Sequence, residues 1–190
     1  MAADFSVKPT IVGPRVVLRP FVPGDFPAVR EALRDPEVVR LTGSRPIVWD
    51  AAAEERLREW YGTRADQRDR LDLAVEERAT GGWVGEVVLN EWDPQHGSCN
   101  FRTMFGPGGR DRGLGTEAVR LLVGYGFEQL GLHRITLEVY SFNPRARRAY
   151  EKVGFVVEEV RRDALRTPQG WVDATVMAIL ADEWGQDQQG

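Results

Sequence analysis

The sequence predicts a single domain of mixed α/β class, built on a mostly antiparallel sheet that contains a parallel step. In the first half, short segments alternate apolar and polar residues between turns, which is typical of an antiparallel meander. The second half runs strand, loop, helix, strand, helix, strand, and a helical crossover makes the strands that it joins parallel. A length of 190 residues suits one hydrophobic core.

The first half accounts for four of the expected strands and two helices. The strands are expected at residues 16–19, 71–75, 83–89 and 98–105, with glycine-containing turns at 80–82 and 93–97. Gly24-Asp25 opens the first helix, which ends near Asp35-Pro36. Asp50 caps a second helix that runs from Ala51 to about Arg64.

The second half adds two helices and three strands. After a glycine-rich segment at 106–113, apolar residues recur at helical spacing from Leu114 to Tyr125, and Gly131 ends this helix. A strand over 135–140, a basic helix over 144–153 and a hairpin of 155–160 with 171–180 complete the domain. We therefore expect seven strands and about four helices in residues 1–182, followed by a polar tail at 183–190.

Composition excludes several classes of function. The net charge of −4 gives no electrostatic case for a nucleic-acid or anionic-membrane partner. No run approaches the roughly 20 apolar residues of a membrane span, and the first ten residues show no signal peptide. The one cysteine, Cys99, fits a reducing compartment, so a cytoplasmic location is expected. His96 and His133 lie too far apart in the sequence to form a metal-ligand cluster, so no metal is expected. The sequence leaves the oligomeric state open, and a homodimer is possible.

The most informative segment joins the strand at 98–105 to the following helix. The first turn of a helix has backbone N–H groups without internal partners, and the helix dipole makes this end positive. Glycines let phosphate oxygens approach these groups, and nearby arginines add charge. The segment therefore predicts a phosphate site formed by Arg110, Arg112, Gly113, Leu114, Gly115 and Thr116. The alternative is a flexible loop followed by an ordinary helix start.

A dinucleotide-binding motif competes for the same residues. Gly113 to Ala118 also matches the pattern G-x-G-x-x-A, with Glu138 at a tolerable distance for a ribose contact. The context disfavours this interpretation, because the match follows an antiparallel meander and too little chain remains for a doubly wound sheet. The Walker pattern fails, since no lysine follows Gly113.

Two motifs together resemble the GNAT superfamily of N-acetyltransferases. They are RDRGLGTEA from Arg110 and NPRARRAYEKVGF from Asn143. The segments LRP from Leu18 and GWVD from Gly170 are similar to the RimJ/RimL branch of that family. The resemblance implies an enzyme that moves the acetyl group of acetyl-CoA to a primary amine, on a peptide or protein N-terminus or on a small amino-acid-like molecule. A catalytically weak acyl-CoA-binding module and a nicotinamide-dependent oxidoreductase are the alternatives.

The resemblance also implies the shape of the site. The sheet would splay into a V between the fourth and fifth expected strands, with the pantetheine arm of CoA in the gap, bonded by the backbone of Met104 and Phe105. One departure concerns Asn100, which stands where many RimJ/RimL-like chains carry a glutamate. The general base is therefore in doubt, with Glu86, Glu91, Asp93 or a water chain as candidates.

The catalytic candidates lie in the second motif. Tyr150 would protonate the departing thiolate, or alternatively pack its ring in the core. Asn143 would bond the pantetheine arm or the acetyl group, and it is also a good helix N-cap; its amide can serve both roles. Among the basic residues Arg145, Arg147, Arg148 and Lys152, one or two would meet CoA phosphates, and we name Arg148. Cys99 is expected to be a buried strand cysteine and not a nucleophile.

The amine would enter from the side opposite CoA. Its walls would be residues 40–55 and the hairpin turn at 161–171, which offer Ile47, Trp49 and Trp171 and five arginines, Arg40, Arg45, Arg161, Arg162 and Arg166. Such a rim suits an amine attached to a neutral or anionic group better than a polycation such as spermidine. The alternative is that these arginines only face solvent.

Overall fold

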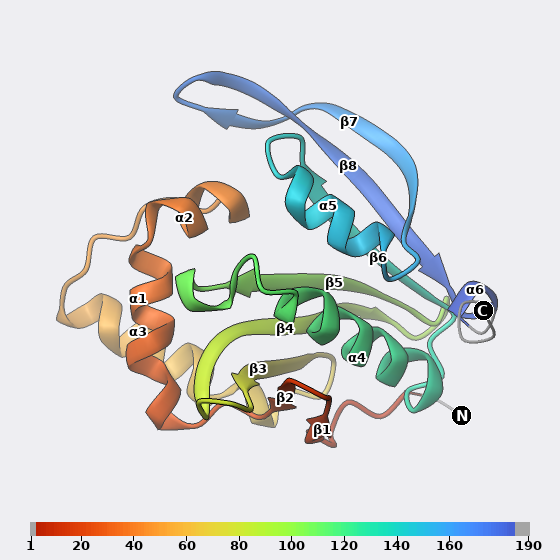
Figure 1. The fold of residues 1–190 in the computed structure, drawn as a ribbon, viewed down its shortest axis with the longest axis horizontal. Helices are drawn as coiled ribbons and strands as arrows, with labels where there is room; N and C mark the ends of the chain where they lie inside the picture. The colour runs from red at the N-terminus through yellow and green to blue at the C-terminus, as the bar shows by residue number, and fades with distance from the viewer. Residues whose placement is uncertain (1–2, 185–190) are drawn as a thin grey trace.

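A sheet of eight strands forms the centre of the computed structural model, which describes residues 3–184 (Figure 1). In spatial order the strands are β1 (Ile11–Val12), β2 (Val16–Arg19), β3 (Leu71–Glu77), β4 (Gly82–Asp93), β5 (Ser98–Phe105), β6 (Arg134–Tyr140), β8 (Gly170–Leu180) and β7 (Val156–Thr167). All neighbouring strands are antiparallel except β5 and β6. The predicted mixed sheet with a parallel step is thus confirmed.

Six α-helices flank the sheet within residues 3–184. They are α1 (Phe26–Arg34), α2 (Pro36–Thr42), α3 (Ala51–Gly62), α4 (Leu114–Glu128), α5 (Pro144–Glu151) and α6 (Ala181–Trp184). Figure 1 shows α4 and α5 over one face of the sheet, while α1 to α3 group at one end of it. α4 contacts β2 and β4, α5 contacts β6, and α2 contacts β5.

Three elements were not expected, and each has a local cause. β1 has two residues and α6 has four, too few for a periodic pattern. Asp35-Pro36 ends α1 as predicted, but it also begins α2, because the Asp35 carboxylate accepts a hydrogen bond from Glu37 N at 2.9 Å and Pro36 takes the first helical position. The expected seven strands and about four helices therefore become eight and six.

The core lies between α4 and the sheet. Leu122, Ala118 and Val123 of α4 are fully buried against apolar strand residues such as Leu73 and Leu89. Cys99 is buried among them, as predicted, and burial raises the pKa of its thiol to about 12. Trp184, expected to belong to a polar tail at 183–190, instead lies in α6 with Glu183 and packs on α4. Its Nε1 donates to Glu128 at 2.9 Å, over Gly124, where a Cβ would lie 2.9 Å from the indole. The tail residues 185–190 lie outside the described residues.

The decisive feature of the sheet is the separation of β5 from β6. The two strands pair only at Ser98–Arg134, Cys99–Ile135 and Asn100–Thr136. Beyond these pairs β5 continues to Phe105 and β6 to Tyr140 without pairing to each other, although β6 stays paired with β8 as far as Tyr140. The predicted V between these strands is confirmed.

Among residues 3–184, no helix has the length and apolar character needed to cross a bilayer.

We expect Leu122→Ala to lower the free energy of unfolding by about 2–5 kcal/mol, because it leaves a cavity between α4 and the sheet. Urea unfolding measures this loss. Val48→Ala serves as the control, since Val48 is 84% exposed and should change stability by less than about 0.5 kcal/mol. Equal losses in both variants would contradict the assignment of the core.

Candidate active site

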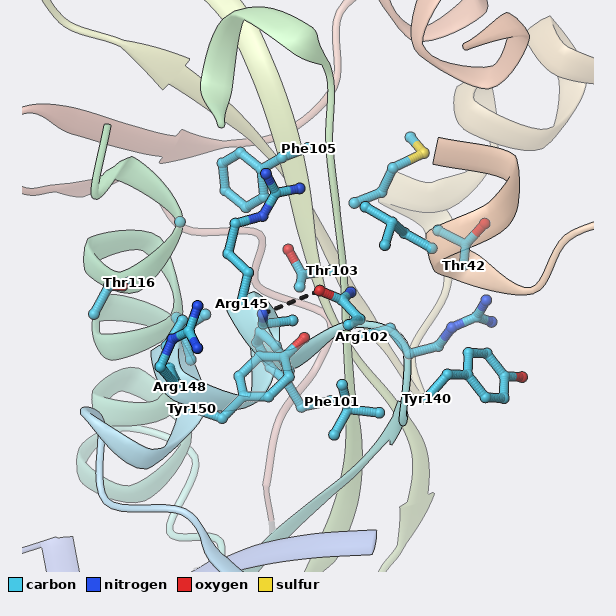
Figure 2. Close-up of a pocket in the computed structure, with 18 of the residues that line it drawn as sticks. Thr42, Phe101, Arg102, Thr103, Phe105, Thr116, Tyr140, Arg145, Arg148 and Tyr150 are labelled. Carbon is cyan, nitrogen blue, oxygen red and sulfur yellow. Dashed lines mark hydrogen bonds between the residues drawn. The ribbon is translucent and has the colours of Figure 1, made fainter. Parts of the chain in front are cut away.

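The gap between β5 and β6 opens into a cleft of about 700 Å³. Its walls come from β5, β6, the segment 106–113, α5, the start of α4 and the end of α2 (Figure 2). Nine of the predicted site residues line it: Met104, Phe105, Arg110, Gly113, Gly115, Thr116, Asn143, Arg148 and Tyr150. Two predicted residues, Arg112 and Leu114, do not.

The N-terminus of α4 reaches the cleft without a side-chain cap. Gly113 precedes the helix in the left-handed region, at φ 76°, where glycine is favoured. No side chain hydrogen-bonds to the first N–H groups of this helix. A Cβ at Gly115 would meet nothing closer than the Phe105 ring at 3.5 Å, so that position is open toward the cleft. These free donors and the positive end of the helix dipole form a site for an anionic group.

Arg110 fixes the glycine-rich segment against α2. Its guanidinium contacts Asp35 at 2.6 Å and Glu37 at 2.6 Å, and its Nε donates to the Phe105 carbonyl at 3.0 Å. Arg145 of α5 joins the same group through Glu37 at 3.0 Å and Asp111 at 2.8 Å. We call these five charged residues the Arg110 network. It connects the phosphate segment, α2 and α5.

The two predicted residues outside the cleft have other partners. Arg112 pairs with Glu77, which lowers the pKa of that carboxyl, and donates to the Gly108 carbonyl at 3.0 Å. Leu114 is buried in the core, as expected of the first apolar residue of α4. In contrast, Arg148 of α5 and Lys152, the residue after α5, line the cleft and have no carboxylate partner among the described residues.

Tyr150 places its hydroxyl in the cleft while its ring lies in the core. The ring is 7% exposed and packs edge-on against Phe101 at 6.2 Å and Phe155 at 5.9 Å. Figure 2 shows the hydroxyl directed into the cleft, and no described residue hydrogen-bonds to it. Burial raises the pKa of Tyr150, so the phenol is protonated throughout the neutral range. Both interpretations of this residue, core packing and a proton donor at the cleft, are compatible.

Asn143 occupies the N-cap of α5. Its Oδ1 accepts a hydrogen bond from Ala146 N at 3.1 Å, which satisfies one of the free donors of that helix. The residue also lines the cleft. Because only the oxygen serves the cap, the NH₂ group is left to donate to a bound molecule.

The opposite side of the cleft contains residues that the sequence did not single out. Figure 2 shows Thr42, Arg102 and Tyr140 on one side of β5, and Tyr150 and Arg148 on the other. Arg102 was missed because a charged residue in an alternating strand normally faces solvent. The available signal was its position next to Phe101, on the strand that borders the predicted gap.

The candidate bases occupy three different environments. Glu86 accepts a hydrogen bond from the Tyr61 hydroxyl at 2.8 Å; burial raises its pKa to about 7, and it does not line the cleft. Asp93 instead bonds to residues of its own turn, including His96 at 2.9 Å. Glu91 alone of the three lines the cleft. Asn100, at the position of the expected glutamate, donates to Asn90 Oδ1 at 3.0 Å.

The expected acceptor walls contribute less than predicted. Of the residues in them, Leu41, Thr42 and Arg161 line the cleft, and Arg161 pairs with Glu138 at 2.7 Å. The others stack on aromatic rings or lie elsewhere on the surface: Arg40 on Phe142, Arg34 on Trp49 and Arg166 on Trp171. α2 extends this wall beyond the predicted range through Val38.

A splayed sheet with a free helix N-terminus at its opening defines an acyl-CoA-dependent transferase. The chain belongs to the acetyltransferase (GNAT) domain family, which it matches over residues 15–156. The protein is therefore an acetyl-CoA-dependent N-acetyltransferase, and the nicotinamide interpretation of the glycine motif is not supported.

Several known proteins are similar over most of this chain. A spermidine N(1)-acetyltransferase of Escherichia coli is 30% identical over 143 residues, 75% of this chain and 74% of the relative. A [ribosomal protein bS18]-alanine N-acetyltransferase of Salmonella typhimurium is 27% identical, over 73% of this chain and 92% of the relative. The fold matches that of spermidine N-acetyltransferase from Vibrio cholerae in complex with CoA and spermine, with a TM-score of 0.81, 23% identity and coverage of 90% and 99%.

The raised pKa of Glu86 predicts a pH-dependent stability. Its carboxyl binds its proton more tightly in the folded chain, so the resulting stabilisation is present below about pH 4.5 and is lost as the pH rises through about 7. Glu86→Gln removes this loss and keeps an acceptor for Tyr61. We expect its stability relative to the wild type to be about 1–3 kcal/mol higher at pH 8 than at pH 5, by urea unfolding. A difference that does not change with pH would contradict the raised pKa.

Proposed function

We propose that this N-acetyltransferase acts on the primary amine of a peptide N-terminus or of a small amino-acid-like molecule, with the two substrates on opposite sides of the β5–β6 gap. The observation that carries the proposal is the parting of the strands after Asn100–Thr136. It leaves one cleft with two chemically different sides, the α4–α5 side and the α2–β6 side.

The α4–α5 side fits the phosphates of CoA. The uncapped first turn of α4 supplies backbone donors, and the cations Arg148 and Lys152 have no ion pair in the described part of the chain. Arg110 supports this side indirectly, because its guanidinium is held by Asp35 and Glu37. Met104 and Phe105 would contribute backbone groups on the gap-facing edge of β5. Acetyl-CoA, when bound, supplies an acetyl group as a thioester.

Tyr150 is the proposed general acid. As the amine nitrogen bonds to the thioester carbon and the C–S bond breaks, the Tyr150 Oη donates its proton to the sulfur. The ring is held by Phe101 and Phe155, so the hydroxyl has a defined direction. The proton of the amine passes to water, since the described cleft lining has Asn100 where a base was expected. Asn143 would orient the acetyl region through its amide NH₂ group.

The names of the relatives point to two kinds of acceptor, spermidine and an alanine of ribosomal protein bS18. Charge favours the second kind. The α2–β6 side contains Arg102, which has no carboxylate partner within residues 3–184, and its acid Glu138 is paired with Arg161. We also propose a cytoplasmic location, which suits the single reduced Cys99.

An acetyl-transfer screen tests the function. Acidic-start peptides, free amino acids, polyamines and aminoglycosides are compared at equal concentration with acetyl-CoA, and thermal unfolding is followed with acetyl-CoA and with NAD. We expect stabilisation by acetyl-CoA alone and turnover of peptides or amino acids. Polycations as the best acceptors by kcat/KM would overturn the proposed acceptor, and stabilisation without turnover would favour a binding module.

Gly115→Val should weaken acetyl-CoA binding by at least about tenfold, because a branched side chain would block the approach of phosphate to the α4 donors. Calorimetry measures the affinity. Gly62→Val is the control, since a Cβ there meets nothing within 4 Å and Gly62 ends α3. Gly113→Val should weaken binding too, but its left-handed φ of 76° adds backbone strain. Unchanged affinity in a folded Gly115→Val variant would refute the phosphate site.

Tyr150→Phe should lower kcat by about 10²- to 10⁴-fold with little change in the KM for acetyl-CoA, since the proton is needed mainly in the transition state. Pre-steady-state kinetics show whether the chemical step limits kcat in each variant. Tyr125→Phe, on α4 and outside the cleft lining, is the matched control. A wild-type kcat in the Tyr150 variant would remove this hydroxyl from the mechanism.

A further inference from the structure

We infer that Arg102 binds a carboxylate of the acceptor and thereby selects amines that carry one. This inference rests on the proposed function, because it assigns the substrate class of the α2–β6 side of the same cleft. The residue is a specificity determinant and takes no part in the breaking or forming of bonds.

The position of Arg102 follows from the pleat of β5. Phe101 faces α5 and packs on Tyr150, and successive side chains of a strand point to opposite faces. Arg102 therefore projects to the α2–β6 side, where Figure 2 shows it near Thr42 and Tyr140. It lies beside the point where the strands part, two residues after the last β5–β6 pair at Asn100.

The charge of Arg102 is available for a ligand. Six cationic residues line the cleft, and three of them, Arg110, Arg145 and Arg161, contact carboxylates of the chain. Of the other three, Arg148 lies on α5 and Lys152 directly follows that helix, on the CoA side. Arg102 is thus the one cation on the α2–β6 side of the lining that has no carboxylate partner among residues 3–184.

The surroundings permit an interaction with a carboxylate. Arg102 is exposed, so a ligand can reach its guanidinium, and Val38 and Leu41 of α2 add apolar surface to the same cleft lining. Arg102 also affects its neighbours: its charge lowers the pKa of Tyr140 and of Glu86 and partly offsets the increase that burial causes in each. A guanidinium can hold a carboxylate through two parallel hydrogen bonds, a geometry that an ammonium group lacks.

The same charge opposes polycations. A polyamine placed along this side would bring a second ammonium group toward Arg102, and the carboxylate that could compensate, Glu138, is occupied by Arg161. Glu91 is the one acid of the lining without an ion pair among the described residues. The structure therefore assigns the acceptor to amines with a carboxylate, either a free amino acid or a peptide N-terminus followed by an acidic residue.

Paired acceptors that differ only in the carboxylate test the inference. One arm compares leucine with 3-methylbutylamine, and the other compares peptides with aspartate or asparagine at the second position. Each pair is assayed with wild type, Arg102→Ala, Arg102→Lys and the control Arg58→Ala, which removes an exposed arginine of α3 outside the cleft lining. Spermidine is assayed as the acceptor with the wild type and with Arg102→Glu.

We expect the wild type to prefer the carboxylate-bearing member of at least one pair. The pair that shows this preference tells whether the carboxylate belongs to a free amino acid or to the second residue of a peptide. Arg102→Ala should lower kcat/KM for that member about 10- to 100-fold and change it less than about threefold for its partner. Arg102→Lys should restore part of the preference, Arg58→Ala should retain all of it, and Arg102→Glu should raise the use of spermidine.

Two outcomes would overturn the inference, and they are distinguishable. If amines are acetylated but Arg102→Ala leaves the ratio within each pair unchanged, the carboxylate site is wrong and the proposed function stands. If no amine in any arm is acetylated while acetyl-CoA still binds, the proposed function fails and the inference fails with it. Thermal unfolding of each variant with acetyl-CoA shows whether the donor side is intact.

Discussion

The site depends on the early end of pairing between β5 and β6. Backbone N–H and C=O groups in a sheet normally satisfy one another, and leaving them unpaired is costly unless water or a ligand replaces the missing strand. Here β4 satisfies one edge of β5 and β8 satisfies one edge of β6, so both strands stay in the sheet while their facing edges separate after Asn100–Thr136. An extended polar chain such as pantetheine is the kind of ligand that this gap can bind as an added strand.

The Arg110 network connects the two sides of the cleft through ion pairs. Asp35 and Glu37 begin α2, the helix that carries Val38 and Leu41 into the acceptor side, and both carboxylates hold Arg110 beside the phosphate segment. Arg145 extends the same contacts to α5. Because these arginines are neutralised within the protein, few charges of the lining have no ion pair among residues 3–184. They are Arg148, Lys152, Arg102 and the acid Glu91.

The sequence predicts the local features well and the relations between distant segments poorly. The start of α4 at Leu114, the cap at Asn143 and the stop at Asp35 all follow from a residue and its immediate neighbours. Arg110 and Arg112 look equivalent in sequence, yet one meets α2 and the other meets Glu77 of β3. Arg102 could not be distinguished from an ordinary exposed strand residue, because its role depends on a gap that tertiary structure creates.

The lack of a glutamate at Asn100 and the free charge of Arg102 are two parts of one electrostatic arrangement. A groove lined by carboxylates binds an amine as its ammonium ion and then needs a base to remove the proton. An amine beside its own carboxylate also holds its proton more tightly, because the negative charge stabilises the cation. Pairing that carboxylate with Arg102 cancels this field, so the neutral amine forms more readily next to Asn100, whose amide is held by Asn90 and offers no base. A carboxylate-bearing acceptor bound as proposed would therefore lose its amine proton to water more easily than one whose carboxylate stays unpaired.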